Sequence, residues 1–286
     1  MAVAAASSTQ SLGTPEWIAA HADDPKVRLI EIAGLGQEAL PAYKAGHVPG
    51  AAAWRWKEAL WDVHMREFPS PAEFAKQLGD SGIANDTTVV FYGEGMQFGI
   101  YAWWTFRLCG HADVRVLDGG RDRWRTEGRA LTTEEPQPPQ PVTYRPVPRR
   151  EGMRIGRDEV LSALDDPTVT ILDGRSPEEY NGTRVGGPGG PDVGAVRYGR
   201  IPGAKHVYFV DLLEADNRFK PAAELQSLFA GRNVTGDRDV ITYCRMSHRA
   251  TVLYFALTQL LGYDRVKVYD GSWTEWGNLV GVPIER

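Results

Sequence analysis

The sequence contains two cysteines, and one of them begins a short basic run. Cys244 opens the segment CRMSHR, in which Arg245 follows the cysteine directly and Arg249 comes after four intervening residues. No acidic residue lies between Cys244 and Arg249. Nearby positive charge favours the thiolate, which is the nucleophilic form of cysteine. The pattern therefore predicts a nucleophile that attacks, or carries away, an anionic group.

The other cysteine, Cys109, has no such neighbours. It lies near the end of the apolar segment AWWTFRLCGH, and cysteine is among the residues most often buried in protein cores. Burial as an inert core residue is also the default expectation for Cys244. Two arginines and a histidine in the next five residues argue against it there. We expect Cys244 to be reactive and Cys109 to be structural.

The residues around Cys244 predict a strand before the thiol and a helix after it. The apolar, β-branched run 240–243 is typical of a buried strand, and residues 250–261 carry apolar side chains at helical spacing before Gly262. A short loop must join these elements. Backbone N–H groups in such a loop have no partner inside the helix and form a cradle for anions. We expect the cradle to comprise Arg245, Met246, Ser247, His248 and Arg249.

Three segments of the sequence occur twice, in the same order. GHVPGA at 46–51 recurs as GRIPGA at 199–204, VVFYGEG at 89–95 as VITYCRM at 240–246, and VRVLDGGRDRW at 114–124 as VKVYDGSWTEW at 266–276. The offsets are 153, 151 and 152 residues. Such regular spacing indicates a tandem duplication.

The duplication divides the chain of 286 residues into two homologous domains. We predict an N-terminal domain at 14–132, an extended proline-rich linker at 133–150 and a C-terminal domain at 151–286. The first copy has Gly93 where the second has Cys244. We therefore expect the first domain to be catalytically inactive and the second to hold the active site.

Each copy alternates strand and helix patterns, which predicts an α/β fold with a mostly parallel sheet flanked by helices. In the second copy the predicted strands are 168–173, 240–243 and 266–270, and the predicted helices are 156–164, 221–229 and 250–261. In the first copy we expect a helix after Thr14 and a capping box formed by Ser70 and Glu73. Ligands of such sheets bind outside the carboxyl ends of the strands, where Cys244 would lie.

The composition excludes several classes of function. With 42% apolar and 24% charged residues and no long apolar run, the sequence is typical of a soluble, cytoplasmic protein without a membrane anchor. A net charge of −5 and the absence of a basic run argue against nucleic-acid binding. The six histidines show no metal-ligand spacing, so we expect no metal site. The tryptophans are expected to fill cores and interfaces.

The duplicated layout, together with GHVPGA, GRIPGA, DGRSPEEY at 173–180, the loop CRMSHR and the ending DGSWTEWGNLVGVPIE, resembles the tandem-domain rhodaneses, the thiosulfate sulfurtransferases. The resemblance implies a silent first domain and a second domain in which Cys244 alternates between thiol and persulfide. Thiosulfate would give its outer sulfur to Cys244, and cyanide, a thiol or a thioredoxin-like protein would collect it. No cofactor is implied.

Roles for the other site residues follow from this resemblance. Arg249 would bind the sulfite half of the donor, and Arg245 would either assist it or pair with Asp173. Met246 is expected to form the loop wall. Ser247 and His248 would contact the substrate through their side chains or contribute only their backbone N–H groups.

Three acidic and basic residues near 175 have competing interpretations. Asp173 would either orient a loop arginine or serve as a turn residue, and Arg175 would either replace a missing substrate arginine or form a salt bridge in the domain interface. Ser176 and Glu179 match a capping box, and we expect capping to be the role of Glu179. Related tandem enzymes often have a substrate-binding arginine at that position.

Three alternative functions stay open. In the related 3-mercaptopyruvate sulfurtransferases the cysteine is usually followed by small residues, whereas two arginines favour the sulfonate-like thiosulfate. Phosphatases of the same fold have five residues between cysteine and arginine, and this loop has four. A third alternative is a sulfur-binding scaffold without catalysis.

The second copy also contains an insert, residues 181–199, with no counterpart in the first. Its glycines and prolines exclude regular secondary structure, and long irregular loops are often functional covers. We expect it to pack against the first domain near the mouth of the active site.

Overall fold

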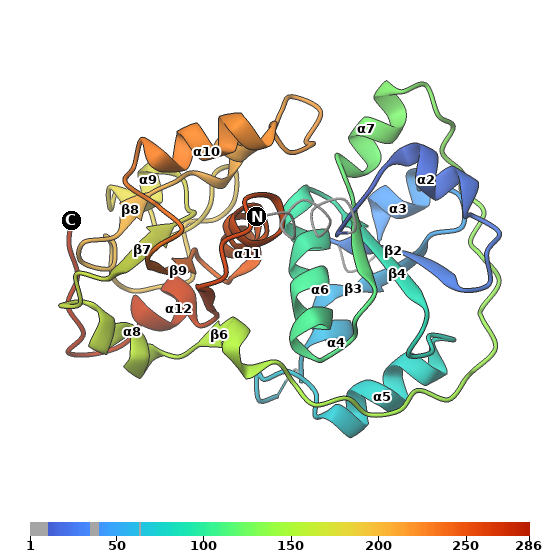
Figure 1. Ribbon diagram of the computed structural model, residues 1–286, viewed down its shortest axis with the longest axis horizontal. Coiled ribbons are helices and arrows are strands. Elements are labelled where there is room, and N and C mark those ends of the chain that lie inside the picture. The colour runs from blue at the N-terminus through green and yellow to red at the C-terminus, as the bar shows by residue number, and fades with distance from the viewer. Residues whose placement is uncertain (1–10, 35–39, 63) are drawn as a thin grey trace. The chain divides into compact units, whose positions relative to one another are not determined.

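The computed structural model describes residues 11–34, 40–62 and 64–286. By their internal contacts these residues form two compact units. The first comprises residues up to 151 together with 215–218, and the second comprises 152–214 and 219–286. Each unit is a five-stranded sheet with helices around it (Figure 1).

The two sheets have the same topology, which reflects the duplication. The first has the strand order β1-β5-β4-β2-β3 and the second β6-β10-β9-β7-β8. Every strand pair is parallel, as expected for strands alternating with helices.

The elements of the first unit begin where the sequence supplies capping residues. Thr14 caps α2, and Ser70 and Glu73 form the predicted capping box of α5. In chain order its elements are β1 (Leu12–Gly13), α2 (Pro15–Ala20), β2 (Val27–Ala33), α3 (Pro41–Ala45), β3 (Ala52–Arg55), α4 (Trp56–Leu60), α5 (Pro71–Asp80), β4 (Thr88–Gly93), α6 (Met96–Leu108), β5 (Val114–Leu117) and α7 (Gly120–Thr126).

The second unit follows the same plan with shorter helices. Its elements are η1 (Glu151–Met153), β6 (Arg154–Ile155), α8 (Arg157–Ala163), β7 (Val169–Asp173), α9 (Pro177–Tyr180), β8 (Lys205–His206), η2 (Phe209–Leu212), α10 (Ala222–Ala230), β9 (Asp239–Tyr243), α11 (His248–Phe255), η3 (Ala256–Leu260), β10 (Val266–Tyr269) and α12 (Ser272–Trp276). The helix predicted at 250–261 thus begins two residues earlier and ends in a π-helical turn, η3.

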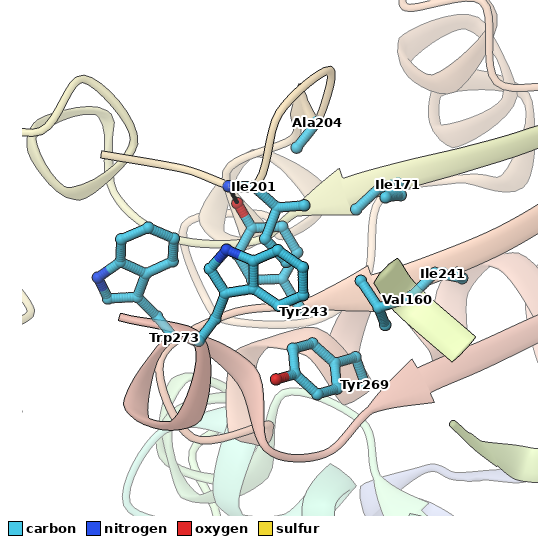
Figure 2. Packing of buried hydrophobic residues seen from close by; sticks show 9 residues of the cluster. Val160, Ile171, Ile201, Ala204, Ile241, Tyr243, Tyr269 and Trp273 are labelled. Atoms are coloured by element: carbon cyan, nitrogen blue, oxygen red, sulfur yellow. Dashed lines mark hydrogen bonds between the residues drawn. The ribbon is translucent and has the colours of Figure 1, made fainter. Parts of the chain in front are cut away.

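The core of the second unit forms on both faces of its sheet. Alternate strand residues Ile171, Ile241 and Tyr243 pack against Val160 of α8 and Trp276 of α12. Helix α11 contacts β9 and β10. Figure 2 shows the cluster around Ile171, Ile241 and Tyr243, in which the Tyr243 hydroxyl accepts a hydrogen bond of 3.2 Å from the N–H of Ile201. This cluster holds the end of β9, and therefore Cys244, in place.

The proline-rich segment 133–150 is extended, without helix or strand. It is also attached to the first unit. The N–H of Val142 donates to the carbonyl of Gly79, and the buried Tyr144 hydroxyl lies 3.0 Å from Nδ1 of His111. Contacts of this kind stiffen the segment beyond what its prolines impose.

Candidate active site

Cys244 is the first residue after β9, at the carboxyl end of the second sheet. Its N–H donates to Oγ of Ser272 at 3.1 Å, and its carbonyl accepts from the N–H of Trp273 at 3.0 Å. Both partners are the first two residues of α12. The residue is only 1% exposed, so a reactant reaches the sulfur only when neighbouring groups move.

The loop after Cys244 turns sharply into α11. Ser247 has a left-handed backbone conformation with φ of 72°, and its hydroxyl donates to the carbonyl of Asp270 at 2.5 Å. Among the residues that the structure describes, no backbone carbonyl accepts from the N–H groups of Arg245, Met246, Ser247 or Arg249. These donors are therefore available to an anion, which is the chemistry that the short loop predicts.

The His248 side chain is directed to the loop itself. Its Nδ1 donates to the carbonyl of Met246 at 3.0 Å, and the residue is 5% exposed. His248 thus braces the loop backbone. A direct contact of its side chain or of the Ser247 hydroxyl with substrate stays a prediction.

Arg249 forms a bidentate ion pair with Glu179 of α9. Its Nη1 and Nη2 donate to the two carboxylate oxygens at 2.6 and 2.8 Å. The side chains are 12% and 0% exposed. Burial alone would raise the pKa of Glu179, but the hydrogen bonds and charge of Arg249 outweigh it and hold that pKa below its ordinary value.

This ion pair bears on the expected role of Arg249 as the binding group for the sulfite half of the donor. Burial would lower the pKa of Arg249, but the hydrogen bonds to Glu179 and the electrostatic interactions with Cys244 and Glu179 together raise it. Arg249 thus lies within electrostatic reach of the thiol while its own charge is balanced by a carboxylate. Glu179 also caps α9 as predicted, because its Oε2 accepts from the N–H of Ser176 at 3.1 Å. The sequence analysis missed its second role, although the acid-free loop already left Arg249 without a local counter-ion.

Asp173 pairs with Arg175 and Tyr243, so of the two alternatives for Arg245 the pairing with Asp173 is not the one that forms. Nη2 of Arg175 donates to Asp173 at 2.6 Å, and the Tyr243 hydroxyl donates to the same oxygen at 2.6 Å. All three side chains are buried, and the Arg175 guanidinium also lies over the Trp273 ring at 4.4 Å.

The cluster of Asp173, Arg175 and Tyr243 therefore supports the sheet edge beneath the loop. Arg175 forms a salt bridge, but with Asp173 of the second unit itself and not with a residue of the first unit, as a bridge in the domain interface would require. With 0% exposure Arg175 is not placed to replace a substrate arginine.

Arg245 has the opposite environment to Arg249. Across the described part of the chain, its guanidinium has neither a carboxylate nor a carbonyl partner, and its Nε is buried without a hydrogen bond. It lies against the backbone of Gly194, in the insert 181–199. A methyl group at Gly194 would be 2.8 Å from Nε and 2.9 Å from Nη2.

The insert has no helix or strand, as predicted, but its conformation is specified by local contacts. The Asp192 carboxylate accepts from the N–H groups of Val185 and Gly186 at 2.7 and 2.8 Å, and the Val185 side chain is buried. These backbone bonds hold the pKa of Asp192 below its ordinary value. Within the second unit the insert lies beside both loop arginines, since a Cβ at Gly187 would lie 4.0 Å from Nη1 of Arg249, a looser contact than that of Gly194 with Arg245.

The corresponding position of the first unit has no room for a thiol. A Cβ atom at Gly93 would lie 2.8 Å from both the carbonyl oxygen of Ile32 and Cβ of Phe98. Real side chains do not tolerate such contacts, so the first copy cannot regain a cysteine there without rearranging β2 or α6.

No cluster of three or more histidine, cysteine, aspartate or glutamate side chains suited to a metal occurs in residues 11–34, 40–62 and 64–286. Over the same residues, no helix is both long enough and apolar enough to span a membrane.

Comparison with known proteins identifies the architecture. The family model for the rhodanese-like domain matches residues 14–127 and, a second time, 156–279. The chain belongs to the rhodanese-like family. As a tandem rhodanese it has its loop cysteine in the second matched domain. The resemblance noted from the sequence motifs and the predicted two-domain α/β fold are both confirmed.

Curated relatives of this rhodanese match it over nearly its whole length. It is 44% identical over 279 residues to the sulfur carrier protein TtuD of Thermus thermophilus, which covers 96% of each chain. It is 39% identical over 281 residues to a Haloferax volcanii protein provisionally named as a thiosulfate sulfurtransferase, again covering 96% of each.

Two solved structures are also similar. One is the anaerobic ergothioneine biosynthesis enzyme of Chlorobium limicola in complex with trimethyl histidine, at 26% identity and a TM-score of 0.83, covering 97% of this rhodanese and 70% of that chain. The other is a variant of EanB in complex with ergothioneine, at 25% identity and a TM-score of 0.85, covering 98% and 70%.

Proposed function

We propose that this rhodanese is a sulfurtransferase that moves the outer sulfur of thiosulfate to an acceptor through a persulfide on Cys244. The observation that carries the proposal is the loop after that thiol: four of its N–H groups are bonded to no described carbonyl, and its first residue, Arg245, has no carboxylate partner among the described residues. Both features suit a small anion with oxygens at one end and sulfur at the other.

The proposed reaction has two displacement steps at sulfur. The Cys244 thiolate attacks the outer sulfur of thiosulfate, the S–S bond within thiosulfate breaks, and sulfite leaves with the bonding electron pair. The N–H groups of the loop would stabilise the anionic terminal sulfur of the persulfide. An acceptor such as cyanide, a thiolate or a thioredoxin-like protein then attacks this sulfur and releases the Cys244 thiolate. No cofactor or external oxidant is required, and ping-pong kinetics should follow.

The experiment is mass spectrometry of the intact protein after exposure to thiosulfate. We expect a gain of one sulfur atom, mapped by peptide analysis to Cys244 and removed by cyanide. Cys244→Ser should abolish this gain, whereas Cys109→Ser, at a buried position outside the loop, should retain it. Labelling of Cys109 in place of Cys244 would refute the proposal.

A second donor, 3-mercaptopyruvate, gains support from the ion pair between Arg249 and Glu179. Two unpaired arginines would favour thiosulfate, but Arg249 is paired with Glu179. A single unpaired guanidinium also suits a monocarboxylate. Initial rates with the two donors decide between them, and we expect thiosulfate to have the larger kcat/KM.

We also propose a cytoplasmic location. Both cysteines are free thiols, and a persulfide-forming thiol persists more readily in a reducing compartment. Retention in the cytoplasmic fraction of the source cells would test this.

A further inference from the structure

We propose that Gly194 of the insert and Asn278, just after α12, are positioning residues that hold the Arg245 guanidinium at the thiol loop as the binding group for the anionic half of the donor. This inference rests on the proposed sulfur transfer. It assigns the insert a role in donor selection, and it assigns Arg249 to support of the loop.

The first support is the fit between Arg245 and Gly194. Gly194 has φ of 122°, a conformation that side-chain-bearing residues rarely adopt, and a Cβ there would come within 2.8 Å of Arg245 Nε. Glycine therefore lets the insert backbone lie directly on the guanidinium. A flexible arginine confined in this way loses less entropy when it binds an anion.

The second support is a hydrogen-bond network that ties the insert to the loop. Asn278 donates to the carbonyl of Gly194 at 3.0 Å and to the carbonyl of Thr274 at 2.8 Å, and it accepts from the N–H of Val196 at 3.0 Å. Thr274 in turn donates to the Arg245 carbonyl through its N–H at 3.0 Å and its hydroxyl at 2.7 Å. Residues 274–278 therefore hold Arg245 in two ways. Thr274 binds its backbone carbonyl, and Asn278 binds Gly194, which lies against its guanidinium.

The third support is the contrast between the two loop arginines. Arg249 is neutralised by a buried carboxylate, so recruiting it for the donor would break a bidentate ion pair. Arg245 carries the unbalanced charge, and no described carboxylate competes for it. The occupant that matches this site is a small donor with an oxyanion group at the end remote from its transferable sulfur.

Gly194→Ala is the principal test. The added methyl group should displace the guanidinium, and we expect the KM for thiosulfate to rise roughly tenfold with little change in kcat, as for loss of a charge-assisted hydrogen bond. Asn278→Ala, at an exposed position, should shift KM in the same direction by a smaller factor without risk to folding. In the Arg245→Ala background, Gly194→Ala should add nothing, because its target is already absent.

A second readout does not depend on sulfur transfer. Anionic iodoacetate and neutral iodoacetamide alkylate the same thiol, so the ratio of their rates at Cys244 reports local positive charge. We expect Arg245→Ala and Gly194→Ala to lower this ratio several-fold. The matched control is Gly190→Ala in the same insert, where the nearest atom to an added Cβ is 3.7 Å away, and it should leave both KM and the ratio unchanged.

The outcomes separate this inference from the proposed function. If the protein takes no sulfur from thiosulfate but the alkylation ratio falls in both variants, the proposed function fails and the positioning of Arg245 stands. If Gly194→Ala leaves the ratio unchanged while Arg245→Ala lowers it, or if their effects on KM add fully, Gly194 does not act through Arg245 and the inference is overturned.

Discussion

At the scale of single residues, the pairing of Glu179 with Arg249 is the main electrostatic feature of the loop. A buried ion pair contributes little net stability, since desolvation offsets its attraction, but removing one partner leaves an uncompensated charge. The pair thus fixes the start of α11 against α9.

The first prediction concerns this carboxylate. Glu179→Gln should lower the free energy of unfolding by about 3 kcal/mol, because Arg249 would remain buried without a counter-ion. Urea denaturation at pH 7 measures this loss. The matched control, Glu178→Gln at the exposed neighbouring position, should have little effect. Equal stability of the two variants would contradict the role of the pair.

The same residue predicts a pH dependence. The folded-state pKa of Glu179 lies below its ordinary value, so the carboxylate contributes its full stabilisation above the pKa of an unfolded glutamate, about 4.3. This contribution is lost as the pH falls through the folded-state pKa. The stability of the wild type should therefore decline more steeply than that of Glu179→Gln below about pH 4.3, and parallel profiles would count against the assignment.

At the scale of secondary-structure elements, the first residue of α12 supports the reactive loop. Ser272 adopts φ of 52°, and its hydroxyl donates to the carbonyl of Tyr269 while accepting the N–H of Cys244. Its counterpart in the first copy is Gly120, with φ of 54°. A serine in this strained conformation is explained by the bond that it makes to the cysteine backbone.

Replacing Ser272 by glycine tests whether its bond to the Cys244 N–H supports the loop. Ser272→Gly relieves the backbone strain but leaves the buried N–H of Cys244 without its acceptor, which should cost about 1–2 kcal/mol of folding stability and slow persulfide formation in rapid-mixing experiments. Ser162→Ala in α8 is the control, since it removes an exposed hydroxyl that donates to the Asp158 carbonyl in its own helix, away from the loop. An unchanged rate of persulfide formation in Ser272→Gly would show that the bond has no part in the chemistry.

At the scale of the whole molecule, duplication has produced two sheets of identical strand order, and the thiol loop belongs to the second copy. The first sheet retains counterparts of the buried contacts that support the edge of the second sheet. Glu31, paired with Arg121, takes the place of Asp173, and the Tyr92 hydroxyl accepts the N–H of Val48 as Tyr243 accepts that of Ile201. The reactive loop is what the first copy lacks.

We therefore expect one transferable sulfur per chain. Titration with thiosulfate followed by cyanolysis should release one equivalent of thiocyanate. The double variant Gly93→Cys with Cys244→Ser should release none, because the Gly93 site is closed by Ile32 and Phe98. A second equivalent in the wild type, or any equivalent in the double variant, would show that the first domain is not silent.

Much of this organisation could be predicted from local patterns. The repeats, the order of strands and helices, the capping boxes and the position of Cys244 after a strand depend on residues close together in the sequence, where periodicity and spacing carry the information. For the same reason the insert could be recognised as irregular from its glycines and prolines alone.

The pairing of charges could not be predicted in this way. Arg249 meets Glu179 across 70 positions, and Arg245 meets Gly194 across 51. The sequence by itself determined the family, the duplicated fold and which of the two cysteines stands in a basic loop. Only the tertiary structure decided which arginine is paired with a carboxylate and which is not, because a guanidinium pairs with the carboxylate that folding brings near it, whatever their separation along the chain.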